Sequence, residues 1–134
     1  MKVAQLRVVL LSGPICAGKS ELTKQLVERH GATILKTRHL IAKIRPTTAS
    51  TRSALQRAGE ALDKESNGAW LATALAQVIE ESRQEGSGQQ IFVVDSVRIL
   101  GQIEAARSAF GSAVHHVHLT AADGELARLR GFAG

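Results

Sequence analysis

An eight-residue stretch near the N-terminus limits the possible folds of this chain more than any other part of the sequence. It matches the pattern G-x-x-x-x-G-K-[ST]. The apolar run Arg7–Ser12 precedes it, and apolar residues at helical spacing follow it from Lys19 to about His30. A strand, then this loop, then a helix is the context in which the pattern binds phosphate. The residues of the pattern are Gly13, Pro14, Ile15, Cys16, Ala17, Gly18, Lys19 and Ser20.

The residue types of this loop define its chemistry. Gly13 and Gly18 let the backbone curve around an anion with successive N–H groups pointing inward, and the following helix adds its positive N-terminal end. Lys19 supplies a charge to the β- and γ-phosphates, and the Ser20 hydroxyl suits Mg²⁺. We therefore expect residues 13–21, of which Glu21 is the last, to bind ATP with Mg²⁺.

Strand-like and helix-like segments alternate along the chain. This alternation predicts an α/β fold with three layers, a parallel sheet with helices on both faces. The ligand site of such a sheet lies beyond the C-terminal ends of its strands. The predicted strands are Arg7–Ser12, Thr33–Leu35, Ile91–Asp95 and Val114–Thr120. The predicted helices are, approximately, Lys19–His30, Thr37–Arg45, Ser53–Asp63, Ala69–Arg83, Ile99–Phe110 and Asp123–Arg130.

An acidic residue, Asp95, ends the apolar run that begins at Ile91. A carboxylate at this end of a strand can face the phosphate loop and hold Mg²⁺ directly or through water. Ser20 and Asp95 are therefore the predicted metal ligands.

Length and composition indicate one domain over residues 1–134, because 134 residues of which 44% are hydrophobic can bury a single core. We expect no membrane segment or signal peptide, and one cysteine suits a reducing cytoplasm. The net charge of +5 indicates an anionic partner. A nucleic acid is disfavoured, since three Phe, one Trp and no Tyr offer few stacking surfaces.

Three stretches resemble the nucleoside monophosphate kinase family, in which adenylate kinases are the nearest well-known pattern. The run from Asp95 through Arg98 to Gln102 is similar to the family's Asp-Gly-Phe-Pro-Arg-x-x-x-Gln segment. Residues 58–63 with 70–75 resemble the segment where the acceptor nucleotide lies, and residues 37–41 stand where the family places an acceptor-phosphate arginine. The dephospho-coenzyme A kinases share the same plan.

The resemblance implies transfer of the γ-phosphoryl group of ATP to a small phosphorylated acceptor, a nucleoside monophosphate above all. Arg98 would contact the bridging phosphates, which a guanidinium can bind through two oxygens. Gln102 would bind the acceptor base, and Arg38 the acceptor phosphate, with Arg45 and Arg52 as alternatives. Two further implied site residues are Gly59, beside the acceptor, and Arg128, from the mobile lid.

The family plan also has a fifth strand and a last helix after the lid. The sequence stops within the expected lid, at about residues 120–134, so we expect a truncated domain of a larger parent chain or a homo-oligomer that completes the sheet. A regulatory ATP-binding module is an alternative. A nucleic-acid-acting ATPase is disfavoured, because Ser96 follows Asp95 where that class often has a second acid.

Three histidines, His115, His116 and His118, lie in the last predicted strand. Alternation puts His116 and His118 on one face and His115 on the other. No cysteine or carboxylate cluster accompanies them, so we interpret them as polar residues near the sheet edge rather than as metal ligands.

Overall fold

The computed structural model describes residues 6–13, 19–86 and 90–119. Residues 14–18, Arg128, the predicted helix at 123–130 and the whole of the expected lid at 120–134 lie outside the described residues. The strands are β1 (Arg7–Ser12), β2 (Thr33–Lys36), β3 (Ile91–Asp95) and β4 (Val114–His118). The helices are α1 (Lys19–His30), α2 (Thr37–Ile44), α3 (Arg52–Ser66), α4 (Ala69–Gln84) and α5 (Leu100–Phe110), followed by the short 3₁₀ helix η1 (Gly111–Ala113).

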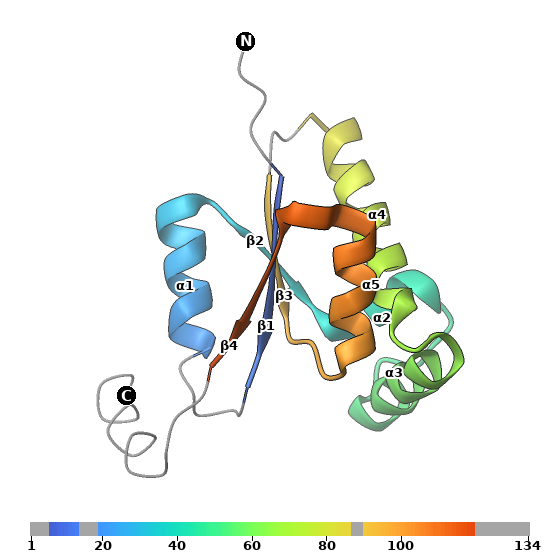
Figure 1. Cartoon of the computed structure of the whole chain (residues 1–134). Helices are drawn as coiled ribbons and strands as arrows, with labels where there is room; N and C mark the ends of the chain where they lie inside the picture. Colours follow the sequence, from blue (N-terminus) through green and yellow to red (C-terminus); the bar gives the residue numbers. More distant parts are fainter. Residues whose placement is uncertain (1–5, 14–18, 87–89, 120–134) are drawn as a thin grey trace.

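The four strands form one parallel sheet in the order β2-β3-β1-β4. Helix α1 covers one face, and α4 and α5 cover the other (Figure 1). This arrangement confirms the predicted α/β fold. Every parallel strand ends at the same edge of the sheet, so the segments after β1, β3 and β4 meet there.

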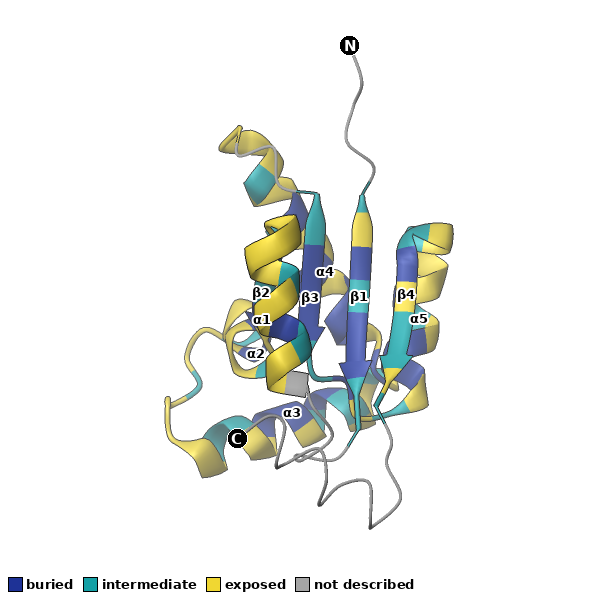
Figure 2. Ribbon diagram, turned by 90° about the vertical axis from the view of Figure 1, so that its left-hand side faces the viewer, coloured by how far each residue is buried: buried dark blue, intermediate teal, exposed yellow. Residues whose placement is uncertain are grey.

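The core is divided by the sheet into two clusters. The larger one lies between the sheet and helices α2 to α5, and the smaller one, with Leu11 and Val93, lies on the α1 side. Successive side chains of a strand point to opposite faces, so Leu10 belongs to the larger cluster and Leu11 to the smaller. The central strands β1 and β3 are mostly buried (Figure 2), as is typical of parallel strands covered on both faces.

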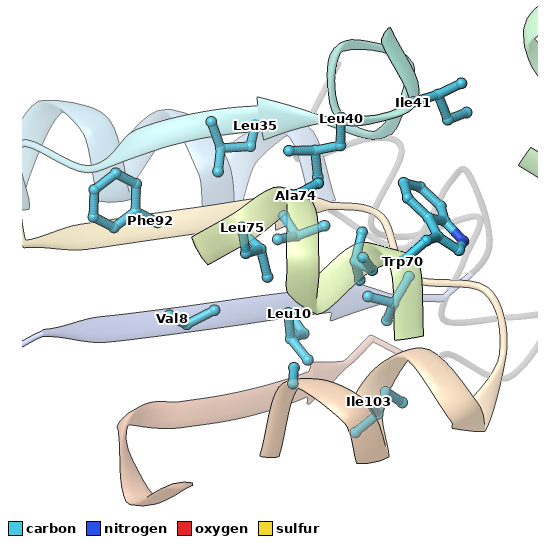
Figure 3. Packing of buried hydrophobic residues seen from close by; sticks show 14 of the residues in the cluster. Val8, Leu10, Leu35, Leu40, Ile41, Trp70, Ala74, Leu75, Phe92 and Ile103 are labelled. Carbon is cyan, nitrogen blue, oxygen red and sulfur yellow. The ribbon is translucent and has the colours of Figure 1, made fainter. Parts of the chain in front are cut away.

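The larger cluster reaches the edge of the sheet at which the strands end. Figure 3 shows Trp70 at that end of the cluster, beyond Leu10 and Leu75. Trp70 is 4% exposed. The start of α4 is therefore anchored directly beneath the edge where a ligand site is expected.

Several element boundaries differ from the predicted ones. Helix α3 begins at Arg52, because the Thr51 side chain accepts a hydrogen bond from the Ala54 N–H and caps it. It continues to Ser66, three residues beyond the predicted end, until Asn67 and Gly68 adopt left-handed conformations. Strand β4 ends at His118 rather than Thr120.

The turn between α3 and α4 packs tightly against the beginning of α5. A methyl group at Gly68 would clash with the backbone nitrogen of Gln102, and one at Gly101 would clash with the carbonyl oxygen of Asn67. Only glycines allow this approach. The contact fixes the beginning of α5, and with it the connection from β3, relative to α3.

Among the described residues, no helix combines the length and the apolar character needed to cross a membrane.

Candidate functional site

The predicted acid, Asp95, lies at the C-terminal edge of the sheet. In the strand register it is paired with Leu11 of β1 on one side and with Lys36 of β2 on the other. Its Oδ2 accepts a hydrogen bond from Lys36 Nζ at 3.0 Å, and its side chain is 19% exposed. The structure thus places Asp95 beside the end of the strand that leads into the phosphate loop, with a cationic partner that the sequence did not reveal.

The beginning of the phosphate loop is held by the segment that follows β4. Gly13 has a φ of +127°, and a methyl group on it would clash with the carbonyl of Leu119. The Leu119 N–H donates to the Ser12 carbonyl at 2.9 Å. Beyond the loop, Lys19 begins α1, and Ser20 and Glu21 are exposed in its first turn. Glu21 accepts a hydrogen bond from Gln25 there.

Asp95, Arg38 and Arg98 come together in a cleft of about 270 Å³ between α2, α3 and the end of β3. We call it the arginine cleft. Arg38 and Arg98 carry permanent positive charge, so two cationic side chains and one carboxylate line the cleft. Its lining residues are Thr37, Arg38, Ile41, Leu55, Gln56, Asp95, Ser96 and Arg98.

Arg98 is fixed by its surroundings. Its Nη2 lies 3.4 Å from Asp63 Oδ2, and its backbone N–H donates to Gln102 Oε1 at 2.8 Å. A methyl group at Gly59 would lie 2.9 Å from the same Nη2. Gly59 therefore makes room for the Arg98 guanidinium. The structure thus places the predicted site residue Gly59 next to Arg98.

Gln102 is fully buried, and both ends of its amide are used within the chain. Its Oε1 accepts from the Arg98 backbone, and its Nε2 donates to Asp63 Oδ1 at 2.8 Å. Trp70 Nε1 donates to the same Asp63 oxygen at 2.7 Å. A role for Gln102 in binding a base stays a prediction, and such binding would require this fully buried side chain to become accessible.

Sequence reasoning missed Asp63, the residue on which these contacts converge. It ended a predicted helix and the stretch 58–63 that resembles the acceptor-nucleotide segment, but no role was assigned to it. The available signal was weak, because Asp63 follows the buried Leu62 but is itself followed by the polar residues Lys64, Glu65 and Ser66. That pattern does not name the partners, which lie up to 39 residues away in sequence.

A second cleft, of about 470 Å³, lies on the other side of the connection from β3 to α5. We call it the histidine cleft. Ser12 Oγ is hydrogen-bonded to His116 Nε2 at 2.8 Å and to His118 Nδ1 at 2.7 Å. The two histidines share a face, as predicted. The lining residues are Ser12, Gly13, Ser96, Val97, Arg98, Ile99, Leu100, Ile103, His116 and His118.

The imidazole of His116 is held towards its neutral form. Burial chiefly, and then the positive charges of Arg107 and His118, lower the pKa of His116 below its usual 6.5. A hydroxyl has one hydrogen to donate and lone pairs to accept. With both rings neutral, Ser12 can donate to one imidazole and accept from the other, which satisfies all three groups.

The predicted magnesium ligands have suitable chemistry. A serine hydroxyl and an aspartate carboxylate are hard oxygen donors of the kind that Mg²⁺ prefers. Ser20 is exposed at the N-terminus of α1, and Asp95 ends the strand next to β1. Within residues 6–13, 19–86 and 90–119, no group of three or more His, Cys, Asp or Glu is placed to hold a metal ion.

A larger, open groove of about 740 Å³ runs between α4 and α5. Its lining side chains, from Ala72 to Gln84 on α4 with Ala109 on α5, include none of the predicted site residues. The convergence of chemistry at the strand ends, rather than cavity size, identifies the candidate site.

A parallel sheet with a phosphate loop after its first strand and an acid at the end of the neighbouring strand defines the P-loop class of α/β proteins. Residues 8–128 match the family described as an AAA domain. The match spans most of the chain, which therefore belongs to this family.

One similar solved structure is titled as an unliganded sugar kinase from Janibacter sp. HTCC2649. The two chains are 15% identical with a TM-score of 0.52, and the match covers 94% of this chain and 66% of the other. This likeness supports the fold. No curated protein matches the sequence, and an adenylate kinase-like specificity stays a prediction.

Proposed function

We propose that this protein binds ATP·Mg²⁺ and transfers the γ-phosphoryl group to a small phosphorylated acceptor, with a nucleoside monophosphate as the first candidate. The observation that carries the proposal is the arginine cleft. It brings Arg38, Arg98 and Asp95 together beside the strand that leads into the phosphate loop. Phosphoryl transfer depends on positioning and on positive charge more than on covalent chemistry, and this cleft offers both.

On the donor side, Lys19 and the backbone of residues 13–18 would bind the triphosphate, and Ser20 and Asp95 would hold Mg²⁺. When bound, the metal supplies positive charge that offsets the negative charge of the phosphates. Lys36, whose Nζ is paired with Asp95 Oδ2 at 3.0 Å, lies beside this proposed metal ligand. Arg128 would add a lid arginine.

On the acceptor side, Arg38 and Arg98 would bind the acceptor phosphate. A guanidinium presents several N–H donors in a fixed plane and can contact two phosphate oxygens at once. Gly59 would serve this side by leaving space for the Arg98 side chain. The proposal leaves the acceptor's identity to experiment, and dephospho-coenzyme A and sugars belong in the same screen, the latter because a similar structure is titled a sugar kinase.

The compartment and the binding partners of the protein are also part of this proposal. We propose that it acts in the cytoplasm on nucleotide and small phosphorylated substrates, without membrane or nucleic acid. The net charge of +5 and the single cysteine support this setting.

An ATP-dependent screen tests the proposal. The full chain is incubated with ATP·Mg²⁺ and a panel of nucleoside monophosphates, dephospho-coenzyme A and sugars, and products are detected by mass spectrometry. ATP binding by Lys19→Ala is measured alongside by calorimetry, and we expect most of the affinity to be lost in a folded variant. Unchanged affinity would contradict the assignment of the loop. Tight ATP binding with no product from any acceptor would favour the regulatory module instead.

A further inference from the structure

The carboxylate of Asp63 is almost enclosed and is held from two sides. Its side chain is 13% exposed. One oxygen, Oδ1, accepts hydrogen bonds from Trp70 Nε1 at 2.7 Å and from Gln102 Nε2 at 2.8 Å. Two donors on one oxygen fix the plane of the carboxylate, so its other oxygen has a defined direction.

That second oxygen, Oδ2, faces Arg98 Nη2 at 3.4 Å. The Arg98 side chain is 41% exposed and lines the arginine cleft. The contact uses one nitrogen of the guanidinium, which leaves donors of the same group for an incoming oxyanion. Gly59 leaves the guanidinium the space to sit there.

The backbone of Arg98 is tied to the same group of residues. Its N–H donates to Gln102 Oε1, while the other end of the Gln102 amide donates to Asp63. Arg98 is therefore positioned at two points, through its main chain by Gln102 and through its side chain by Asp63. Both points depend on buried groups of α3, α4 and α5, which cannot shift independently of the core.

We propose that Asp63 is a positioning residue that holds the Arg98 guanidinium at the arginine cleft for an anionic acceptor, with Trp70 and Gln102 fixing the orientation of its carboxylate. This inference rests on the proposed function for the identity of the cleft. An arginine placed in advance loses less rotational freedom on binding an oxyanion than a freely moving one. Asp63 thus acts through Arg98 and does not touch the acceptor.

The variant Asp63→Asn tests the positioning role with little change of shape. The amide oxygen can still accept from Trp70 and Gln102, but an NH₂ group replaces the oxygen that faces Arg98 and cannot accept from it. We expect a folded protein with unchanged ATP affinity and a fall of about 10–100-fold in kcat/KM for the acceptor, the range typical of lost outer partners of a functional group. Most of the fall should come from a higher acceptor KM.

Two control variants separate positioning from stability. Glu81→Gln breaks an ion pair away from the cleft, that of Glu81 on α4 with Lys43 on α2, in which the Glu81 side chain is 51% exposed. It should leave kcat/KM unchanged. Trp70→Phe removes a donor to Asp63 without altering the oxygen that faces Arg98. Because Trp70 orients the carboxylate but does not supply the charge that faces Arg98, we expect a smaller fall in kcat/KM than in Asp63→Asn, and a larger fall would overturn the inference.

A measurement without turnover keeps the inference distinct from the proposed function. Arginine side-chain NMR signals of the wild-type chain are titrated with inorganic phosphate, and those of Arg98 are assigned through Arg98→Lys. We expect the Arg98 signal to be restricted before phosphate is added and to shift on titration, and to be mobile with a weaker response in Asp63→Asn. Equal mobility and equal response in both proteins would overturn the inference, even if the acceptor screen succeeds. The expected difference would support it, even if no acceptor is phosphorylated.

Discussion

Two clefts share the connection from β3 to α5, and they differ in the kind of charge that lines them. Ser96 and Arg98 line both. The arginine cleft, towards α2 and α3, adds Arg38 and Asp95. The histidine cleft, towards the end of β4, adds Ser12 with His116 and His118. Beyond the shared Arg98, one cleft therefore has a second guanidinium and a carboxylate, and the other has two imidazoles, of which His116 has a lowered pKa.

The difference indicates that the two clefts have different roles on the two sides of the connection from β3 to α5. A phosphate that must be bound at any physiological pH is best met by guanidinium groups, which stay protonated. The imidazoles instead hold the beginning of the phosphate loop, because Ser12 bonds to both and lies directly before Gly13. On this interpretation the arginine cleft receives the acceptor, whereas the histidine cleft supports the loop.

The largest expected effect comes from removing the side chain of Arg98, the arginine that lines both clefts. Arg98→Ala should lower phosphoryl transfer by about 10²–10⁴-fold, the scale of a lost charge at the transition state, while ATP affinity changes far less. Arg38→Ala should lower the acceptor kcat/KM in the same direction. Steady-state kinetics against the acceptor found in the screen measures both.

His118→Ala is the matched comparison on the other side. It removes one of the two rings that bond to Ser12, and we expect a smaller loss than in Arg38→Ala. A larger loss in His118→Ala would reverse the assignment of the two clefts, because the acceptor would then depend on the histidine cleft.

A smaller effect, on stability, is expected at the turn between α3 and α4. This turn packs against the beginning of α5 and so positions the connection from β3 to α5 that separates the two clefts. Gly68 has a φ of +85°, and a methyl group there would meet the backbone of Gln102 at the beginning of α5. Gly68→Ala should lower the free energy of unfolding by about 2–5 kcal/mol, which combines a left-handed conformation for a residue with a Cβ and overpacking. Denaturant unfolding at constant pH measures the loss.

Gly86→Ala provides the control for that substitution. Gly86 also has a left-handed φ, of +70°, but nothing lies within 4 Å of the position a methyl group would take. It should cost only about 1–2 kcal/mol, the strain alone. Equal losses in the two variants would mean that the contact between the turn and α5 is not tight, and that the connection from β3 to α5 can move.

The fold was more predictable from the sequence than the site. The bounds of β1, α1 and β3 agree with the predicted ones, because apolar strand residues and a phosphate loop are local signals. By contrast, α3 ends later than predicted, because the left-handed Asn67 and Gly68 close it through their fit to α5.

The contacts that define the two clefts could not be predicted, because they depend on tertiary register. That His116 and His118 share a face follows from alternation, but their convergence on Ser12 requires the pairing of Ser12 with His118 across β1 and β4. Likewise, the pattern that suggested Arg98 and Gln102 gave no indication of Asp63, which belongs to a different helix. The chemistry of Lys19 and Ser20 remains predicted from the motif alone.

The smallest expected effect is a pH dependence of stability that originates in the histidine cleft. The pKa of His116 is lowered in the folded protein, by burial first and then by Arg107 and His118. The unfolded chain, with a pKa near 6.5, therefore binds a proton more readily than the folded one. The contribution of His116 to stability is present above pH 6.5 and is lost as the pH falls through the folded-state pKa.

We expect the free energy of unfolding of the wild-type chain to fall more steeply from pH 7.5 to pH 5 than that of His116→Gln, whose side chain does not titrate. Groups that do not interact with His116 contribute equally in both proteins, so the difference between the two curves reports on His116 together with its neighbour His118. A His115→Gln variant, altered on the opposite face of β4, serves as the control and should follow the wild-type curve. Parallel curves for wild type and His116→Gln would show that the Ser12 hydrogen bonds survive protonation, and that the histidine cleft is as indifferent to pH as the arginine cleft.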